Sequence, residues 1–472
     1  MFVQQFFVKG LAHSSYLLGG SQKCAIVDPR RDVDMYLDAA EDMGMKITHI
    51  LETHLHADFV SGHLDLAERT GAVIVAPKSA KCKFKHKAVT EGDRFNIDDM
   101  QLKVLDTPGH TPEHITYILT DKSRGPQPVS IFCGDVLFVG DVGRPDLFPG
   151  KAKKLASQLY DNLHQKLLKL PDFCEVYPAH GAGSLCGRAM GAKRTSTIGY
   201  ERRYNAALQI MDKDKFIESL TTNMPGAPDH FSRCSAVNGK GPALVSKSPI
   251  LLAMPPQAFA RKAKKPNTIV LDIRNYEAFG GQHVPRAFHV DFGGNFATFA
   301  GWILPPDKDI LLVAASPQQA SDANVWLKRV GLDRVVGFLE GGMFAWAKDG
   351  LPMEHIYQIG AVELHDMINK QRGLALVDVR AVAEYKSNHI KGAVNIPAPE
   401  LRQRYKELNK NKPVILVCST GHRSSLGASL LKQRGFTNVY NVAGGMTGYG
   451  VAGFAPECPM CMAPHVPQIR TM

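Results

Sequence analysis

The sequence has no long apolar run. Nowhere in its 472 residues do apolar side chains continue for the roughly eighteen positions that a membrane-spanning helix requires. Residues 1–10 also lack a basic stretch ahead of an apolar core and a small-residue cleavage pattern, so a secretory signal is not expected. These absences predict a protein that neither crosses a membrane nor is exported.

Cysteine is scarce and irregularly spaced. The nine cysteines are scattered through a long chain, a pattern typical of reduced thiols in a reducing compartment rather than of a disulfide framework. We therefore expect a cytoplasmic protein in which individual thiols can be reactive.

Long basic blocks are absent as well, although the formal net charge is +11. No cluster is long enough to follow a phosphate backbone, so we expect small anionic substrates rather than nucleic acid. The densest cluster, Arg261 to Lys265, stands just before Pro266. It is interpreted as an exposed linker.

What the sequence does contain is an ordinary globular composition, spread over more residues than one core supports. Hydrophobic residues make up 44% and charged residues 21%, close to the averages of globular proteins. A chain of this length predicts roughly two to four domains.

Four segments of the first half share one design, a β-branched run that ends at a polar side chain. Each is predicted to be a buried strand followed by a loop. Helices are expected over residues 33–43 and 153–170, which gives a layered α/β architecture. The segments are Ile47–Thr53 before His54, Leu102–Leu105 before Thr107–His110, Val129–Gly134 before Asp135, and Cys174–Ala179 before His180.

The second half contains an internal repeat. The same offset relates Asp272 to Asp378 and His283 to His389, and Gly-Gly-Met recurs farther along both copies, at Met343 and Met446. Two copies of one domain are therefore expected. Proline and polar residues interrupt the pattern in 255–267 and around 351–358, where we expect the boundaries.

Six potential metal ligands fall at the predicted strand ends, and a further histidine, His63, follows the first of them. Neutral imidazoles and carboxylates are the ligands that suit zinc or ferrous iron. One histidine alone is more often structural, but so many at matching positions predict a metal centre. The six are His54, His56, Asp58, His110, Asp135 and His180.

These residues, with Thr107-Pro-Gly-His110-Thr and Gly134-Asp135 in the same order, resemble the metallo-β-lactamase superfamily over residues 1 to about 200. The resemblance implies an αββα sandwich, which we assign to residues 1–255. Thioester hydrolases of the superfamily carry a histidine directly after the motif's aspartate, and this completes a second metal site. Phe59 stands there in this chain, and a phenyl ring cannot bind a cation, so a two-zinc hydrolase is less expected.

The remaining pattern resembles persulfide dioxygenases, which hold one ferrous iron by two histidines and one carboxylate. The resemblance implies His54, His110 and Asp135 as ligands of one Fe²⁺ per chain. Such a facial triad leaves positions for substrate and O₂. His56, Asp58 and His180 would then orient ligands or substrate. For Arg144, in Gly143-Arg144-Pro-Asp146, three roles stay open: holding the iron-site loops, holding an anionic substrate, and a plain surface salt bridge.

The segment after the last motif histidine bears on the substrate. It reads Gly181-Ala-Gly-Ser-Leu-Cys186-Gly, where glutathione-using relatives carry bulkier polar residues. The segment resembles bacterial dioxygenase–rhodanese fusions, which implies a low-molecular-weight thiol persulfide, coenzyme A persulfide among them. Cys186 is either a sulfur relay or a buried inert thiol.

Val414-Ile-Leu-Val-Cys418-Ser-Thr-Gly-His-Arg423 predicts a buried strand, a short loop and a helix beginning near Ser424. Converging backbone N–H groups in such a loop, including those around Gly421 and His422, favour a thiolate or its persulfide anion. Arg423 adds a cation that can fork onto sulfur oxyanions.

This loop, with Asp378, Arg380 and His389 upstream, resembles rhodanese sulfurtransferases, here over residues 355–455. The resemblance implies that Cys418 accepts sulfane sulfur, with Arg423 and the loop amides binding the anion. The first copy, residues 265–352, has Ala314 at the nucleophile position and Pro317 in the loop. We therefore expect an α/β rhodanese-like module without sulfur transfer, serving as a spacer or docking surface.

The sequence as a whole predicts an enzyme that oxidises a persulfide to sulfite and moves sulfane sulfur to or from thiosulfate. Its partners are then a persulfide, O₂, sulfite and thiosulfate, and we expect a homo-oligomer. A zinc thioester hydrolase and a non-catalytic persulfide sensor remain alternatives. The C-terminal tail, residues 456–472, holds Cys458 and Cys461, interpreted as an exposed thiol pair. Their roles and that of Cys234 stay open.

Overall fold

The computed structural model describes residues 1–454 except 189, 223, 225 and 371–372, so the predicted tail with Cys458 and Cys461 lies outside the described residues. The described chain forms two compact units. Residues 1–248 with 325–332 form the first, and residues 249–324 with those from 333 onward form the second. Among the described residues, no helix combines the length and apolar composition that crossing a bilayer requires.

The first unit contains two six-stranded sheets. The first sheet has the order β1(Phe2–Val8), β2(His13–Gly19), β3(Lys23–Val27), β4(Lys46–Leu51), β5(Val73–Pro77) and β6(Lys87–Val89). The second has the order β12(Ser196–Thr197), β11(Glu175–Pro178), β10(Ser130–Gly134), β9(Ile115–Asp121), β8(Met100–Asp106) and β7(Arg94–Ile97).

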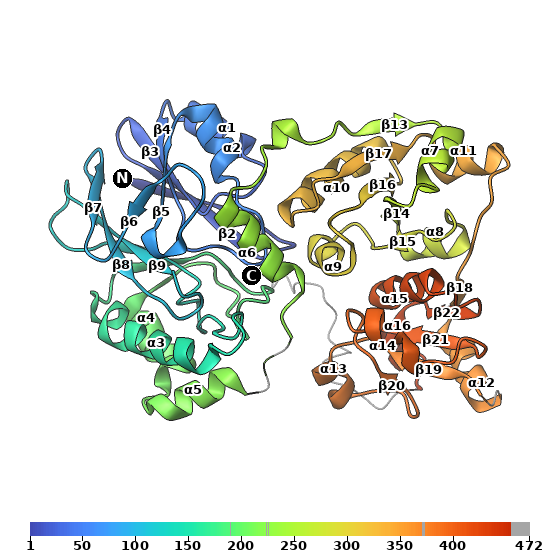
Figure 1. Cartoon of the computed structure of the whole chain (residues 1–472). Coiled ribbons are helices and arrows are strands. Elements are labelled where there is room, and N and C mark those ends of the chain that lie inside the picture. The colour runs from blue at the N-terminus through green and yellow to red at the C-terminus, as the bar shows by residue number, and fades with distance from the viewer. Residues whose placement is uncertain (189, 223, 225, 371–372, 455–472) are drawn as a thin grey trace, which may run out of the picture. The chain divides into compact units, whose positions relative to one another are not determined.

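Helices cover the outer faces of both sheets (Figure 1). α1(Asp34–Asp42) and α2(His63–Thr70) lie on the first sheet, and α3(Ala152–Gln165), α4(Ile198–Tyr204) and α5(Lys213–Thr221) lie on the second. A further helix, α6(His230–Lys240), follows α5 in the chain. Short 3₁₀ turns lie at Lys78–Ala80, Leu167–Lys169, Ala207–Gln209 and Val245–Lys247.

Alternation along the strands explains this layering. Tyr16 and Leu18 of β2 join the core between the two sheets, whereas Leu17 between them joins the core beneath α1 and α2. Because successive side chains of a strand point to opposite faces, a strand that is apolar on both faces must be covered on both. All seven residues of β2 are buried. The predicted αββα sandwich is confirmed.

The second unit contains two five-stranded parallel sheets with the same strand order. The first runs β13(Leu252–Met254), β17(Val335–Leu339), β16(Asp309–Val313), β14(Thr268–Asp272) and β15(Phe288–His289). The second runs β18(Tyr357–Ile359), β22(Val439–Val442), β21(Val414–Val417), β19(Ala375–Asp378) and β20(Val394–Asn395). This identity of order confirms the repeat seen in the sequence.

Corresponding helices connect the strands of each copy, as expected of parallel sheets, whose crossovers need a helix or a long connection. In the first copy they are α7(Pro256–Ala263), α8(Tyr276–Gly281), α9(Phe296–Ile303), α10(Pro317–Arg329) and α11(Gly342–Lys348). In the second they are α12(Ala361–Lys370), α13(Val382–Ser387), α14(Leu401–Arg404), α15(His422–Gln433) and α16(Gly445–Val451), with a 3₁₀ turn at Tyr405–Glu407.

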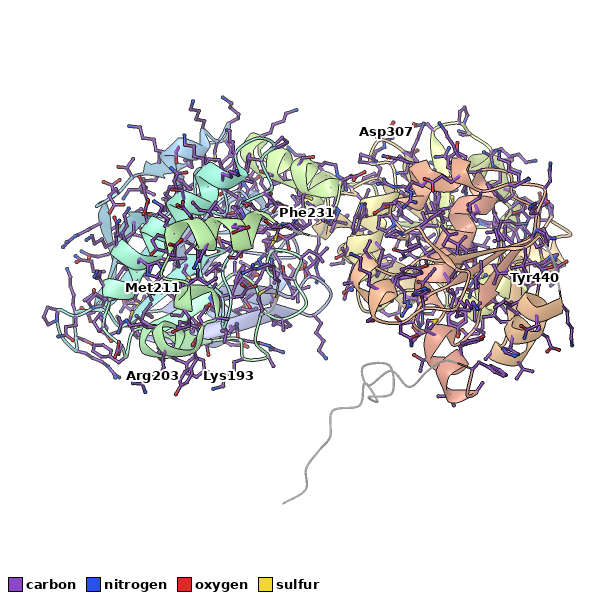
Figure 2. All side chains as sticks on the ribbon, turned by 90° about the horizontal axis from the view of Figure 1, so that it is seen from below. Lys193, Arg203, Met211, Phe231, Asp307 and Tyr440 are labelled. Carbon is purple, nitrogen blue, oxygen red and sulfur yellow. The ribbon has the colours of Figure 1, made fainter. Side chains whose placement is uncertain are left out.

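One local expectation is wrong, and one helix start is shifted slightly. Arg261 to Ala263 do not belong to a linker, because they form the end of α7, where Phe259 and Ala260 are buried. The helix after the Cys418 loop begins at His422, two residues before the predicted start near Ser424. Arg261, Lys264 and Lys265 are nevertheless exposed, as predicted. Lys193, Arg203 and Met211 stand on the surface of the first unit (Figure 2), and Met211 is 70% exposed.

Candidate functional site

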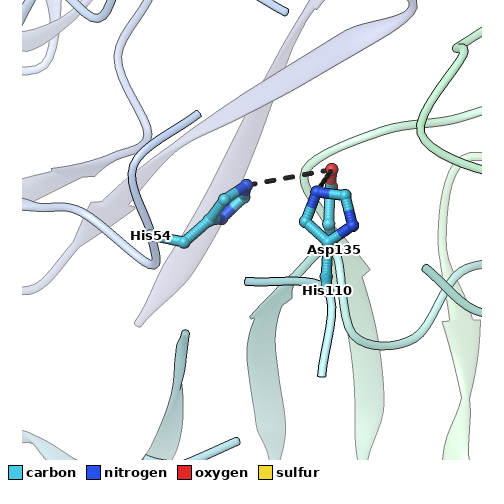
Figure 3. Close-up of side chains that lie close together, drawn as sticks. All are labelled: His54, His110 and Asp135. Carbon is cyan, nitrogen blue, oxygen red and sulfur yellow. Dashed lines mark ion pairs between the residues drawn. The ribbon is translucent and has the colours of Figure 1, made fainter. Parts of the chain in front are cut away.

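The loops after three strands bring two histidines and one aspartate together. His54 follows β4, His110 follows β8 and Asp135 follows β10 directly, and all three side chains are buried. One possible ligand atom from each lies within 4.8 Å of the others. The two imidazoles face the carboxylate (Figure 3), with Nε2 of His110 3.4 Å and Nε2 of His54 3.8 Å from Oδ2 of Asp135.

The other ring nitrogen of each histidine is already engaged. His54 Nδ1 lies 2.9 Å from the hydroxyl of Thr53, and that hydroxyl donates to Asp28 Oδ2 at 2.9 Å. The Nδ1–H of His110 donates to the backbone oxygen of Arg144 at 2.8 Å. A hydrogen bond at Nδ1 fixes the tautomer in which Nε2 keeps its lone pair. Both Nε2 atoms are buried and have no hydrogen-bond partner in the structure, which is the arrangement a metal requires.

The charges of the three groups also suit a cation. Burial lowers the pKa of His54 and of His110, so both imidazoles are neutral near pH 7. Burial opposes ionisation of Asp135, but the neighbouring imidazoles hold the pKa of its carboxyl well below the usual value. Two neutral nitrogens and one carboxylate are a donor set that fits ferrous iron or zinc.

His180 and Asp58 adjoin this cluster. His180 Nδ1 lies 2.7 Å from Asp135 Oδ1, and its Nε2 lies 2.8 Å from Asp58 Oδ2. Burial opposes charge on the ring, yet the two carboxylates raise the pKa of His180 well above its usual value. Asp58, His180 and Cys186 form a second group with possible ligand atoms within 4.8 Å of one another.

His56 points to a different partner. Its Nε2 lies 3.1 Å from Asp28 Oδ1, and with Asp28 and Glu52 it forms a third buried group of possible ligands. Burial raises the pKa of Glu52 to about 8. His63 lies farther along, in α2, where its ring packs against Phe84 with centroids 4.5 Å apart.

Phe59 and Cys186 are both fully buried. The Phe59 ring packs against His13, with centroids 3.9 Å apart, and against His56 at 4.4 Å. Cys186 lies in an apolar cluster with Phe138 and Phe231. Burial raises the pKa of the Cys186 thiol well above its usual value, which favours the protonated, unreactive form.

Arg144 lies in the interior rather than at the surface. Its side chain is 2% exposed, forks onto Asp146 through two bonds of 2.7 Å, and donates from Nη1 to the backbone oxygen of Leu185. Its backbone N–H donates to the oxygen of Cys186. The alternative of a surface salt bridge is therefore wrong, since this residue ties the loop that holds His110 to the segment that carries Cys186.

Several supporting residues carried no sequence signal. Asn238 of α6 donates to the backbone oxygens of His56 and Phe59 and accepts from the N–H of Ser61. It thereby fixes the ligand loop. His114 Nε2 accepts from the N–H of Asp135 at 3.0 Å.

Gly134 ends β10 and directly precedes Asp135. Its φ is +49°, and a Cβ there would come within 2.5 Å of His114 Nε2 and 2.6 Å of Thr53 Oγ1. Only glycine fits this position without moving both neighbours.

The second candidate site is the loop between β21 and α15. Cys418 is 1% exposed, and its sulfur accepts from the N–H of Gly421 at 3.1 Å and from the hydroxyl of Ser424 at 3.3 Å. Gly421 has a φ of +104°, which turns its N–H toward the sulfur. Such a loop stabilises negative charge on sulfur.

Arg423 is engaged by a carboxylate. It donates two hydrogen bonds of 2.7 Å to Glu384 and one of 2.8 Å to the hydroxyl of Ser419. Burial opposes ionisation of Glu384, but Arg423 lowers the pKa of that carboxyl to about 2. Asp378 and Arg380 form a similar buried fork beside β19.

The corresponding loop of the first copy lacks the nucleophile, as its sequence predicts, but Pro317 lies at the start of α10 and not in the loop. Ala314 follows β16 at the position of Cys418, and α10 begins at Pro317. Proline is tolerated at the first helical position because no N–H is needed there. The loop before the helix has neither the nucleophile nor a glycine.

Three segments of the chain match known families. Residues 8–180 match the metallo-beta-lactamase superfamily, and residues 255–349 and 360–452 each match the rhodanese-like domain. The chain belongs to the metallo-beta-lactamase superfamily and carries two rhodanese-like domains. A solved metallo-beta-lactamase from Staphylococcus aureus subsp. aureus COL is 34% identical, with a TM-score of 0.65 over 72% of this chain and 98% of that chain.

Curated relatives of this superfamily member fall into two kinds. The mitochondrial persulfide dioxygenase of Mus musculus is 29% identical over 234 residues, which are 47% of this chain and 82% of the mouse protein. The hydroxyacylglutathione hydrolase of Rhodospirillum rubrum is 38% identical over 159 residues, 33% of this chain and 57% of that protein. The chain spans a similar part, 52%, of the hydrolase of Rhizobium meliloti.

These matches and the fold confirm the expected family and architecture, with a metallo-beta-lactamase domain followed by two rhodanese-like domains. They show an enzyme superfamily with both dioxygenase and hydrolase members. The predicted ligands His54, His110 and Asp135 lie together in the structure, while the individual roles of the site residues stay predictions.

Proposed function

We propose that this protein oxidises a low-molecular-weight thiol persulfide with O₂ at His54, His110 and Asp135 and transfers sulfane sulfur at Cys418. In this proposal the domain with the two six-stranded sheets is the dioxygenase, the first rhodanese-like copy, which includes β13 and α7, transfers no sulfur, and the second copy is the sulfurtransferase. The observation that carries it is the buried triad combined with Phe59, where a second-metal ligand would stand.

Ferrous iron held by His54, His110 and Asp135 would supply open coordination positions at which O₂ and the terminal sulfur of a persulfide meet. The donor set fits one such ion per chain, because both Nε2 atoms lack other partners and the carboxylate is ionised. Zinc fits the same donors, and its chemistry would be hydrolysis.

The surrounding side chains hold this donor set in place. Thr53 and the backbone oxygen of Arg144 orient the two imidazoles. The bond from His180 fixes the plane of the Asp135 carboxylate, and Asp58 holds the other side of the His180 ring. Partners of this kind raise ligand basicity and reduce the reorganisation needed during the reaction.

The proposed oxidation balances as RSSH + O₂ + H₂O → RSH + SO₃²⁻ + 2 H⁺. The sulfur–sulfur bond breaks, the terminal sulfur is oxidised to sulfite, O₂ is reduced, and the thiol leaves with its hydrogen. Coenzyme A persulfide is among the candidate substrates, because the small residues after His180 leave no bulky polar side chains for glutathione.

The proposed sulfur transfer uses the loop amides and Cys418. A Cys418 persulfide attacked by sulfite gives thiosulfate and the Cys418 thiolate: Cys–S–S⁻ + SO₃²⁻ → Cys–S⁻ + S₂O₃²⁻. The reverse reaction loads the cysteine from thiosulfate. The N–H of Gly421 and the hydroxyl of Ser424 stabilise the anionic sulfur in both states. A relay through Cys186 stays a prediction.

A zinc-dependent thioester hydrolase is the second candidate, favoured by the resemblance to hydroxyacylglutathione hydrolases. Phe59 speaks against it, since the ring offers no donor for a second ion. A non-catalytic persulfide sensor is the third candidate. The buried triad and the hydrogen bonds to the Cys418 sulfur argue against a non-catalytic sensor, because both are suited to catalysis.

One experiment separates the three candidates. The protein is purified anaerobically, its metals are quantified, and O₂ consumption is recorded after adding coenzyme A persulfide or hydroxyacylglutathione. About one iron per chain with persulfide-dependent O₂ uptake supports the proposal. Two zinc ions with thioester cleavage, or persulfide binding with neither reaction, would overturn it.

The cellular setting follows from the same chemistry. We propose a cytoplasmic location, since no disulfide joins any of the seven described cysteines and a reducing compartment keeps thiols reduced. The proposed partners are small molecules: a persulfide, O₂, sulfite and thiosulfate. The expected homo-oligomer stays a prediction that sedimentation would test.

A further inference from the structure

The first rhodanese-like copy contacts one face of α15, the helix that carries the Cys418 loop. His289 of the first copy donates from its N–H to the hydroxyl of Ser429 at 3.1 Å, and its Nδ1 lies 2.9 Å from the hydroxyl of Ser425. Gln433 donates to the backbone oxygen of Arg286. Residues 425, 429 and 433 repeat every four positions, so they form one stripe along the helix.

The same stripe reaches the active loop at its N-terminal end. Position 422 lies three residues before 425, and the His422 side chain pairs through Nδ1 with Asp291 of the first copy. The Tyr276 ring meets His422 edge-on, with centroids 5.1 Å apart. A Cβ on Gly421 would come within 2.9 Å of Tyr276 Cζ. The first copy therefore touches the loop directly beside the amide that bonds Cys418.

The two cations of the loop differ in their surroundings. Arg423 is forked onto Glu384 of its own domain, with both carboxylate oxygens engaged. His422 is 55% exposed and meets a single carboxylate oxygen across the copies. It follows Gly421, whose N–H bonds the Cys418 sulfur. An incoming anion therefore finds His422 more accessible than the forked guanidinium.

Several charged and titratable groups surround His422. Asp291 raises the pKa of His422 by hydrogen bonding, and Glu277 of α8 adds to this, against partial burial. Tyr276 is neutral near pH 7. His289, 3.8 Å from Asp291, has a pKa lowered by burial and adds no charge. Arg423 follows next in the chain, but Glu384 balances it.

We propose that the first rhodanese-like copy is one wall of the sulfur-transfer site, and that its Asp291 keeps the His422 imidazolium beside Cys418, where it binds sulfur oxyanions such as thiosulfate and sulfite. Asp291 is then a positioning residue that acts through His422. The copy that lost the nucleophile keeps a role in binding. This inference rests on the proposed sulfur transfer at Cys418.

The test measures the Michaelis constant for thiosulfate as a function of pH in the full-length protein. Asp291→Asn removes the partner, His422→Gln removes the cation, and Asp309→Asn is the matched control. Asp309 is another aspartate of the first copy. It lies at the start of β16, at the opposite end of this strand from Ala314, and it pairs with Arg334.

The expected result depends on pH in a defined direction. With Asp291 present, His422 stays protonated to a higher pH, so thiosulfate binding weakens only as the pH rises through that raised pKa. In Asp291→Asn the weakening should begin at lower pH, with the Michaelis constant near pH 8 up about three- to tenfold and little change near pH 6. His422→Gln should weaken binding at both pH values, and Asp309→Asn should match the wild type.

A purely structural role for Asp291 predicts another pattern. It would change the Michaelis constant equally at all pH values or lower only the turnover number, and either result would overturn the proposal. A readout without turnover is the rate of Cys418 alkylation, followed by mass spectrometry. The ratio of the rate with iodoacetate to that with neutral iodoacetamide should fall in His422→Gln. An unchanged ratio contradicts the proposal.

Failure of the proposed function gives a different signature. If the wild-type protein does not turn over thiosulfate, sulfur transfer at Cys418 is wrong. The His422 titration measured by NMR, with the signal assigned from His422→Gln, still reports on the pair. If the pKa of His422 is the same in Asp291→Asn as in the wild type, the inference is refuted whatever the activity.

Discussion

The Nδ1–H of His110 donates to the backbone oxygen of Arg144 at 2.8 Å, and this bond makes the geometry of the candidate metal site depend on the loop after β10. The Arg144 side chain is anchored in turn on Asp146 and on the Leu185 oxygen. His110, a proposed ligand that follows β8, is thus oriented by Arg144, which lies in the loop after β10. Substitutions in residues 144–146 should therefore change metal binding indirectly, by altering the orientation of the His110 ring.

Asp135→Ala should abolish iron binding and persulfide-dependent O₂ uptake while leaving thiosulfate turnover at Cys418. Asp135 supplies the only carboxylate of the triad, whereas the C-terminal domain has its own core. The measurements are metal content and both activities. Asp121→Ala is the matched control, a buried aspartate of the same sheet that bonds Ser123. Loss of both activities in a folded Asp135→Ala protein would contradict this separation.

Thr53→Val should weaken metal binding about tenfold to a hundredfold without removing a ligand, because partners of ligating histidines have effects of this size. The Thr53 hydroxyl links His54 Nδ1 to Asp28, and valine keeps the shape but loses both bonds. Thr48→Val is a close control, since Thr48 also lies 2.9 Å from Nδ1 of the next histidine, away from the triad. Metal titration with a competing chelator measures the difference, and equal affinities in the two variants would argue against the orienting role.

Much of the metal centre could be predicted from the sequence, because its ligands end strands. His54, His110 and Asp135 each follow a predicted strand, and chemistry is expected in loops at strand ends. His54 follows β4 of the first sheet and the other two follow β8 and β10 of the second, so the site lies where loops of both sheets meet. The orienting groups could not be predicted in the same way. Asp28 meets Thr53 and Asn238 meets Phe59 across long stretches of chain, and a buried polar residue shows its partner only in the folded structure.

The errors have equally local causes. Arg261 to Lys265 is basic and stands before Pro266, which resembles a linker, but Phe259 and Ala260 bury one side of the same segment as a helix. The helix after the Cys418 loop begins early because Gly421 takes a positive φ and lets the first turn start at His422. The contact of Asp291 with His422 joins the two copies, and no periodicity within either copy indicates it.

Phe59→His should raise the metal content above one ion per chain. The substitution restores a donor next to Asp58, whose carboxylate already lies 2.8 Å from His180, so three possible ligands would surround a second position. Phe59→Leu is the control, since it changes the packing on His13 without adding a donor. The measurement is metal content after reconstitution with zinc. If Phe59→His binds only one ion per chain, as Phe59→Leu is expected to do, then Phe59 does not limit the number of metal ions bound.

Glu384→Gln should destabilise the C-terminal domain more at pH 7 than near pH 3. Arg423 lowers the pKa of Glu384 to about 2 from the usual 4.5. The ion pair therefore stabilises the folded state above the unfolded value, and this stabilisation is lost as the pH falls toward 2. Because the side chain is 35% exposed, we expect only about 1 kcal/mol at pH 7. Amide hydrogen exchange of β21 measures it, and a loss independent of pH would rule out the ion pair as the cause.

Cys418→Ser should keep persulfide-dependent O₂ uptake and shift the product from thiosulfate toward sulfite. Serine preserves the size of the side chain and its place among the loop amides, but its hydroxyl is not a comparable nucleophile at neutral pH. Arg423→Ala should weaken the same step less, because the Gly421 N–H and the Ser424 hydroxyl still reach the sulfur. Cys186→Ser is the matched control, a buried cysteine of the other unit whose raised pKa favours the inert thiol. Sulfite and thiosulfate are quantified at equal O₂ uptake, with nonenzymatic exchange subtracted. If Cys418→Ser still makes thiosulfate at the wild-type ratio and Cys186→Ser does not, sulfur is carried at Cys186 and the assignment of the rhodanese loop is wrong.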